Sequence, residues 1–262
     1  MLEYDFMRNA LAAGAVIAVL AGAVGYFLVL RNLAFAGHAL SHIGFAGATG
    51  ALLIGVAPFW GLIAVTTAGA AAMGVLGDRL RGRDVAVGVV LTLSLGCGVL
   101  FLNLYTAYAT QATALLFGNV LGVSRQALGE LTLLTVASLA ALGTIARPLI
   151  FATLDPELAE AKGLSLRIVS VLFLMIVGIA VAESVQVVGI LLVFALMVGP
   201  GATALQLVPG VNAGVAIAVA LAVAETVSGI VLAYVTDWPP TFWIATLSAL
   251  IYLLAVLVAG WR

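Results

Sequence analysis

The chain has 262 residues, of which 65% are hydrophobic and only 8% are charged, and its mean hydropathy is +1.28. Soluble domains carry about 25% charged residues, so this composition excludes a soluble globular protein and indicates an integral membrane protein. The net charge of −1 does not identify a partner, because the placement of charges in such a chain matters more than their sum.

Nine apolar runs are long enough to cross a hydrocarbon core of about 30 Å, which takes about 20 helical residues. They cover residues 10–30, 36–57, 59–77, 85–103, 127–146, 167–184, 187–207, 212–235 and 240–260. The division near Gln186 is open, since 167–207 could also hold one span and a half-helix. Residues 104–125 are too polar for a span and predict a short helix in a periplasmic or re-entrant segment. The sequence therefore predicts an all-α polytopic bundle of eight to nine transmembrane helices, forming a single domain over residues 1–262.

Basic residues predict the orientation of this bundle. With the N-terminus outside and nine spans, the inner loops hold eight of the ten basic residues, and only Arg8 and Arg125 lie outside. The inner residues are Arg31, Arg79, Arg81, Arg83, Arg147, Lys162, Arg167 and Arg262. Because cytoplasmic loops are rich in Lys and Arg, we expect a periplasmic N-terminus and a cytoplasmic C-terminus.

The inner loop between residues 147 and 167 predicts a short helix with defined ends. Asp155 can cap the helix, Pro156 suits its first position, Glu157 lies in its first turn and Gly163 can end it. Such a helix is either an ordinary connector or a docking element for a cytoplasmic partner. The chain has no phosphate-binding G-x-x-x-x-G-K-[ST] motif, because its only lysine, Lys162, lies in the run AKGL. Any ATPase that drives it is therefore another chain.

The two histidines of the chain lie four residues apart in the run AFAGHALSHIGFAG, so His38 and His42 share one face of a helix. Ionisable groups within spans are costly and often functional. Two imidazoles, supplemented by carboxylates, suit zinc or manganese. The alternative is two neutral imidazoles bonded to backbone carbonyls. An intramembrane metalloprotease is disfavoured, because H-E-x-x-H needs Glu where Ala39 stands.

Two carboxylates lie within predicted spans. Glu225 is close to the middle of its span, in the run ALAVAETVSG, and could either line a transport pathway or be a protonated, hydrogen-bonded carboxyl inside the bundle. Glu183 is near the outer end of its span, where it could simply face water. Glu130 is near enough to the interface to be a solvated end residue. Glu225 and Glu183 thus join the histidines as candidate metal ligands.

Prolines predict interruptions at two places. Gly199-Pro200-Gly201 falls late in the seventh span, and the run DWPP from Asp237 to Pro240 precedes the ninth. A broken helix at membrane depth needs protein or water to satisfy its backbone, which suits a pathway lining. The alternative is that each run only ends a span.

Four motifs in a fixed order resemble one family of membrane proteins. They are RNLAFAGHALSHIGFAG, LLFGNVLGVS, LDPELAEAKGL and VVGILLVFALMVGPGATA. Together they are similar to the permease subunits of bacterial ABC importers for zinc, manganese or iron, a group related to siderophore and cobalamin permeases. His42 matches the histidine of the family pattern G-D-x-L-x-H, whereas His38 replaces its aspartate and Asn119 stands where the family often has aspartate.

The resemblance implies a type II importer architecture without catalytic activity of its own. It implies a permease homodimer, two cytoplasmic ATPase subunits and a periplasmic metal-binding protein, in a bacterial inner membrane and without nucleic acid or a permanently bound cofactor. The cytoplasmic segment at about 155–163 matches the region that contacts the ATPase. Its candidate contact residues are Asp155, Glu157, Glu160, Lys162 and Gly163.

The missing aspartate at position 38 bears on the cargo. Imidazole suits zinc, iron, nickel or copper better than manganese, so the sequence favours zinc, with iron or manganese behind it. If both imidazoles bind the metal, affinity should fall as the pH drops into the range where histidine gains a proton. Two alternatives remain: a metal-chelate permease of the same architecture, and a proton-coupled secondary transporter that uses Glu225 and His42.

Overall fold

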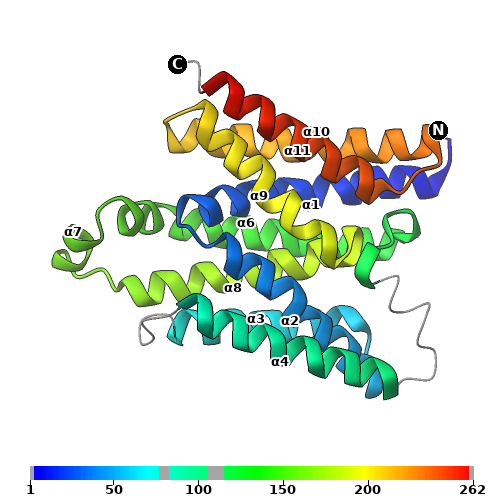
Figure 1. The fold of residues 1–262 in the computed structure, drawn as a ribbon, viewed down its shortest axis with the longest axis horizontal. Coiled ribbons are helices and arrows are strands. Elements are labelled where there is room, and N and C mark those ends of the chain that lie inside the picture. The colour runs from blue at the N-terminus through cyan, green and yellow to red at the C-terminus, as the bar shows by residue number, and fades with distance from the viewer. Residues whose placement is uncertain (1–2, 77–82, 105–114, 260–262) are drawn as a thin grey trace. The chain divides into compact units, whose positions relative to one another are not determined.

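The computed structural model describes residues 3–76, 83–104 and 115–259, and within these ranges its regular elements are all helices. Figure 1 shows their order along the chain. The helices are α1 (Asp5–Leu30), α2 (Ala34–Leu53), α3 (Pro58–Leu76), α4 (Arg83–Leu104), the 3-10 helix η1 (Val120–Gly122), α6 (Arg125–Leu154), α7 (Pro156–Ala161), α8 (Leu166–Val188), α9 (Ile190–Leu207), α10 (Val211–Thr236) and α11 (Pro240–Ala259).

The predicted spans agree with the helices. Among the described residues, eight helices are long and apolar enough to cross a membrane: α1, α3, α4, α6, α8, α9, α10 and α11. The remaining predicted span, 36–57, corresponds to α2, a helix of 20 residues whose histidines, serine and threonine lower its apolarity. The all-α polytopic prediction is confirmed. Arg79, Arg81 and Arg262 of the orientation argument, and residues 105–114 of the semi-polar segment, lie outside the described ranges.

The apolar stretch 167–207 forms two helices, as one of the two sequence interpretations expected, and they are separated by a single glycine. α8 ends at Val188 and α9 begins at Ile190, with Gly189 at a φ of +80° between them. Gly118, at a φ of +76°, lies directly against this junction, since a Cβ on it would meet the backbone of Val188 and Gly189. Both positions need glycine, because left-handed backbone and backbone contact each exclude a side chain. The motif LLFGNV thus packs against the turn between α8 and α9.

The predicted interruption at Pro200 is wrong, because α9 continues through Pro200 to Leu207. Proline supplies no N–H to the carbonyl of Leu196 and normally weakens a helix. Here the surrounding turn is held by packing, with a Cβ on Gly201 only 2.8 Å from the carbonyl oxygen of Gly25. The other proline prediction is confirmed, since α10 ends at Thr236 and α11 begins at Pro240.

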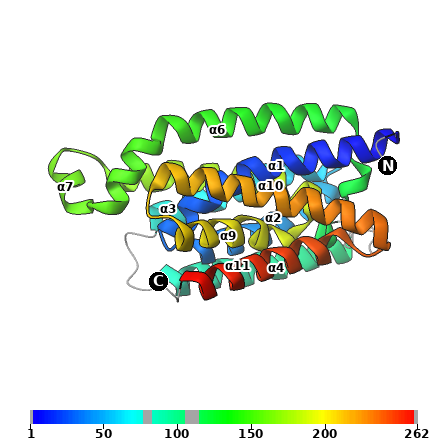
Figure 2. The same cartoon turned by 90° about the horizontal axis from the view of Figure 1, so that it is seen from above.

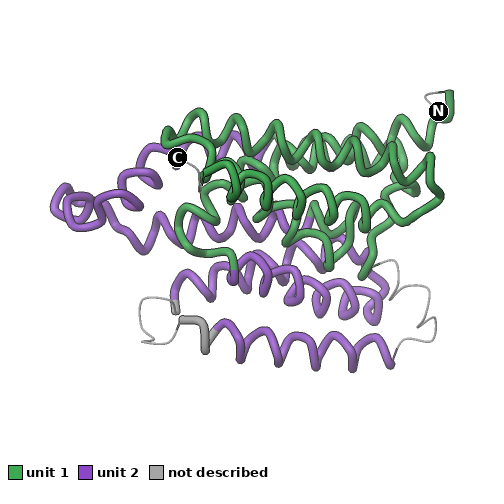
Figure 3. Tube along the Cα trace, turned by 45° about the horizontal axis from the view of Figure 1, so that its top comes forward, with its two compact units in different colours: residues 1–34, 113–136, 183–262 green, residues 35–112, 137–182 purple. Residues whose placement is uncertain are grey.

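Contacts divide the chain into two compact units, coloured separately in Figure 3. Unit 1 comprises residues 1–34, 113–136 and 183–262, and unit 2 comprises residues 35–112 and 137–182. Unit 1 therefore holds α1, η1, the first part of α6, α9, α10 and α11. Unit 2 holds α2, α3, α4, α7, the rest of α6 and most of α8.

Unit 1 is built around α1, which packs against α9 and α10, while α11 packs against the same two helices. Figure 2 shows α1 and α10 side by side along their lengths. Glycines allow this contact at backbone distance: a Cβ on Gly22 would lie 2.8 Å from the Ala218 carbonyl oxygen, and one on Gly25 would overlap the Met197 carbonyl. Small residues serve this purpose in membrane bundles, where apolar burial alone does not drive helices together.

In unit 2, glycines likewise let α2 and α3 pack at backbone distance. A Cβ on Gly47 would overlap the carbonyl of Gly61, and a Cβ on Gly61 would overlap that of Gly47, so the two backbones touch at this crossing. Nearby, Gly44 faces the side chains of Leu62 and Thr66. These contacts fix which side of α2 packs on α3, and therefore where its other side chains point.

Candidate functional site

The histidine pair lies on α2, in unit 2. The His38 and His42 rings meet edge to face with their centroids 4.7 Å apart, and both side chains are half-buried. At 3.6 residues per turn, the side of α2 that bears them lies opposite the side that carries Gly44 and Gly47. The structure thus brings the two imidazoles together on the face of α2 that is directed away from α3.

Glu183, near the end of α8, is fully buried rather than exposed to water. Its carboxyl oxygen Oε2 accepts a 2.6 Å hydrogen bond from the hydroxyl of Thr135 on α6, which is itself buried. The expectation that Glu183 could simply face water is therefore wrong. An apolar environment makes such a bond valuable, because leaving a buried carboxyl without it costs free energy.

Replacing Thr135 with valine is expected to lower the free energy of unfolding by about 1–3 kcal/mol, because Glu183 loses this hydrogen bond while the side-chain shape is kept. Thermal unfolding of the purified chain measures the change. Thr132→Val is the matched control on the same helix, since that hydroxyl is exposed and bonds only locally, to the Leu128 carbonyl. Equal stability of the two variants would contradict the structural role of the Thr135–Glu183 bond.

Glu225, on α10, is 1% exposed. Neither of its carboxyl oxygens has a hydrogen-bond partner among the described residues. The hydroxyl of Ser248 on α11 lies near the carboxyl group but outside hydrogen-bond geometry. Glu130, by contrast, is exposed as expected and accepts a 3.0 Å bond from Gln126.

Helix α7 has the predicted ends. The Asp155 side chain accepts a 3.1 Å hydrogen bond from the Leu158 N–H, and Pro156 is the first helical residue. At the other end Gly163 adopts a φ of +81°, and the Leu164 N–H reaches back 3.0 Å to the Ala159 carbonyl, as in a Schellman motif.

One further contact joins α7 to the preceding helix. The Lys162 ammonium lies 5.6 Å from the centre of the Phe151 ring on α6, within the range of a cation–π interaction. Figure 1 shows α7 beyond the ends of α6 and α8, both of which it joins. Glu157, Leu158 and Glu160 are exposed, so α7 offers an apolar residue between acidic ones.

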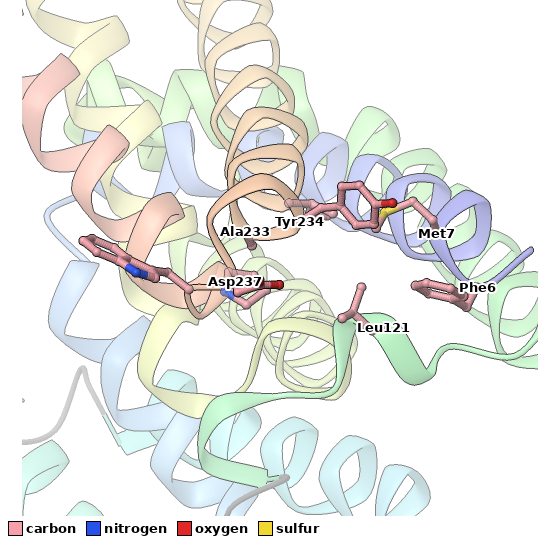
Figure 4. Close-up of a pocket in the computed structure, with 9 residues that line it drawn as sticks. Phe6, Met7, Leu121, Ala233, Tyr234 and Asp237 are labelled. Carbon is pink, nitrogen blue, oxygen red and sulfur yellow. The ribbon is translucent and has the colours of Figure 1, made fainter. Parts of the chain in front are cut away.

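A hollow of about 520 Å³ lies in unit 1, at the end of α10. Figure 4 shows Asp237 and Phe6 on opposite sides of it, with Leu121 between them. Asp237 is its single carboxylate, and the remaining lining is mostly aromatic or aliphatic, so the hollow has no metal-ligand set. Among the described residues of either unit, no three His, Cys, Asp or Glu side chains converge on one point.

The arrangement so far is a polytopic bundle with a histidine pair and a capped surface helix. The ABC 3 transport family profile matches residues 3–259, nearly the whole chain. This chain belongs to the ABC 3 transport family.

Two relatives of this chain are named as metal transport proteins. The chain is similar to a probable metal transport system membrane protein of Treponema pallidum, with 33% identity over 98% of this chain and 96% of the relative. It is also similar to the manganese transport system membrane protein MntC of Halalkalibacterium halodurans, with 29% identity over 90% of this chain and 82% of the relative. The resemblance drawn from the four motifs is therefore confirmed.

A solved structure has the same fold. PsaBC from Streptococcus pneumoniae, determined in complex with Fab, superposes with a TM-score of 0.87 over 97% of this chain and 92% of that chain, at 23% identity. Family membership and the long apolar helices together make the chain a multi-pass transport component of the ABC 3 family. The relatives do not support the preference for zinc that the His38 replacement suggested.

Sequence reasoning missed three buried hydroxyls inside the ABC 3 bundle. Thr135, Ser248 and Thr203 are buried hydroxyls within apolar runs, and the first two lie beside Glu183 and Glu225. Threonine and serine often bond their own helix backbone, so a hydroxyl in a span gives little signal alone. A search for hydroxyls at the depth of each intramembrane carboxylate would have included them.

Proposed function

We propose that this chain is the membrane-spanning subunit of an ATP-driven importer for a divalent metal ion, with manganese the first candidate cargo and iron and zinc behind it. Membership of the ABC 3 transport family over residues 3–259 is the observation that carries the proposal. Manganese comes first because the MntC relative is named for it. The importer would comprise two copies of this chain, two cytoplasmic ATPase subunits and a periplasmic metal-binding protein, in a bacterial inner membrane.

His42 and His38 are the proposed metal-contacting residues. Their edge-to-face rings place nitrogen donors close together on one face of α2. Neutral imidazole binds first-row divalent ions, and two donors hold a passing ion without trapping it as a closed four-ligand site would. Glu183 is less suited to this role, because its carboxyl oxygen is engaged by Thr135.

α7 is the proposed docking element for the ATPase, which places the C-terminus in the cytoplasm and the N-terminus in the periplasm. This helix of 6 residues has fixed ends, because Asp155 caps its start and Gly163 turns the chain after it. The contact between Lys162 and Phe151 supports it against α6. A docking element must keep its shape when its partner moves. Glu157, Leu158 and Glu160 would then contact the ATPase.

Co-purification with the ATPase tests the proposal. We expect a soluble ATPase to be retained by the tagged chain and lost when Leu158 is replaced by aspartate, because a charge would enter the centre of the docking surface. Leu121→Asp is the matched control, since Leu121 is 45% exposed, as Leu158 is, but lies on η1. Retention of the ATPase by Leu158→Asp would contradict docking at α7. Metal uptake by the chain alone in ATP-free vesicles would contradict the importer and support a secondary transporter.

The cargo is tested separately. ATPase activity of the assembled complex is measured with the periplasmic protein loaded with manganese, iron or zinc in turn. Stimulation by manganese above that by zinc is the expected result, and stimulation by zinc alone would restore the preference derived from His38.

A further inference from the structure

The carboxyl of Glu225 has no hydrogen-bond partner among the described residues, and the proposed importer function does not use it. It is the only acidic or basic residue in α9, α10 and α11. It lies 14 residues after Val211, the first residue of the 26-residue α10, and is 1% exposed. Arg8, on the neighbouring α1, is an exposed residue near the N-terminus that pairs with Asp5. No basic side chain of these four helices is therefore placed to compensate a charge at Glu225.

Helix α11, which faces Glu225, carries the hydroxyl oxygen of Ser248. α10 and α11 are joined by the short turn at Asp237 and run antiparallel, and a Cβ on Gly229 would lie against Ile244. Glu225 lies one turn before Gly229 on α10, and Ser248 lies one turn after Ile244 on α11. Because the two helices are antiparallel, Glu225 therefore faces Ser248. Ser248 is buried, and its hydroxyl makes a long bond of 3.4 Å to the Ala195 carbonyl. This hydroxyl can therefore turn toward an ion at Glu225 at little cost.

Helix α9 lies beside Glu225 of α10 and Ser248 of α11, and the part of α9 that meets them contains Pro200. The Ser248 hydroxyl lies against the Cα of Gly199, where a Cβ would overlap it. Pro200 leaves the Leu196 carbonyl without its helical N–H donor. Thr203 follows Gly199 by one turn, so it leaves the helix on the same side. Its hydroxyl is fully buried and has no hydrogen-bond partner among the described residues.

We propose that Glu225 and Ser248, beside the turn of α9 that contains Pro200, form an internal binding site for a small hard cation, such as sodium, magnesium or manganese. The donors are a carboxylate and a hydroxyl, and the carbonyl of Leu196, which Pro200 leaves without its helical donor, is the candidate third donor on α9. Oxygen donors select hard cations, whereas zinc prefers nitrogen and sulfur. A bound cation would also remove the cost of a carboxylate buried without a partner.

A hollow lies beside Ser248, one of the donors of this site. It has about 360 Å³, lies between α9 and α11, and is lined by Gly199 and Ser248 together with alanines and the rings of Phe194 and Tyr252. The site is separate in chemistry from the histidine pair and does not depend on the importer proposal.

Ion-dependent stability of the full-length chain tests the site. The unfolding temperature is measured in sodium chloride against choline chloride of equal ionic strength, and in choline with manganese, magnesium or zinc added. We expect sodium, or magnesium and manganese, to raise it by about 3 °C. The sodium and divalent arms identify which hard cation binds, and either response supports the site. The shift should vanish in Glu225→Gln and shrink in Ser248→Ala.

Thr226→Val is the matched control, because the neighbouring Thr226 is equally buried but bonds the Ala222 carbonyl of its own helix at 2.7 Å. It should keep the full ion response. Each shift is taken within one variant, so a change in basal stability does not affect the comparison. No response to any of the hard cations, a response kept by Glu225→Gln, or a response to zinc alone would overturn the site. Because the readout is unfolding rather than uptake, it can fail while the importer proposal stands.

Discussion

Metal uptake by a His42→Ala variant is expected to fall at least about tenfold. The His38 and His42 rings are 4.7 Å apart, so alanine at position 42 removes one of two adjacent nitrogen donors. His38→Ala should have a smaller effect, because only His42 matches the family pattern. If both imidazoles hold the same ion, the double variant should lose little more than His42→Ala alone, since residues that act as a unit are not additive. Uptake of manganese into vesicles that contain the assembled complex measures all three.

Ser41→Ala is the control for the histidine experiment. Ser41 lies on α2 between the two histidines, is fully buried, and its hydroxyl bonds the His38 carbonyl at 2.7 Å. Uptake should stay within about twofold of the wild type, because no metal donor is lost. Unchanged uptake in His42→Ala would show that the pair is a packing feature of α2 and not part of the metal path.

The Gly25→Ala variant is expected to yield little folded protein. A single methyl group at position 25 would overlap the carbonyl of Met197, where α1 crosses α9. Backbone cannot turn aside as a side chain can, so the helices must separate, at a cost of about 3 kcal/mol or more. Size-exclusion chromatography in detergent, followed by thermal unfolding, measures the loss.

Gly143→Ala is its control. Gly143 lies within α6, another long apolar helix, but nothing lies within 4 Å of the place its Cβ would occupy. Alanine favours helix over glycine by about 1 kcal/mol, so this variant should be as stable as the wild type or slightly more stable. A folded Gly25→Ala variant of equal stability would show that α1 and α9 do not pack at backbone distance.

Local chemistry explains what the sequence could predict of this fold. Apolar length predicted the spans, and capping chemistry predicted α7, because Asp155 and Gly163 act within one turn of the helix. Gly189 could be expected near Gln186, since a glycine between two apolar runs marks a turn. Each of these features depends on residues that are neighbours in sequence.

The remainder depends on residues that are far apart in sequence. Glu183 is buried because Thr135, 48 residues earlier, supplies its hydrogen bond. Pro200 stays within α9 because Gly25 lets α1 support that turn. Periodicity reports which side of a helix is apolar, and it does not report which helix covers that side.

Cargo was the least predictable property. Two nitrogen donors at His38 and His42 favour zinc when considered alone, whereas the named relative MntC is a manganese protein. Two donors on one helix are too few to select a metal, because selectivity needs the number and geometry of all ligands.

The glycine contacts of α1 have a consequence for motion. Where Gly22 and Gly25 touch the backbones of α10 and α9, neither helix can slide along α1 without bringing a side chain against a main chain. Close-packed elements of this kind shift between discrete arrangements and do not deform gradually. During a transport cycle α1, α9 and α10 should therefore travel as one rigid body, so that labels placed on these three helices keep constant mutual distances while the transporter opens and closes.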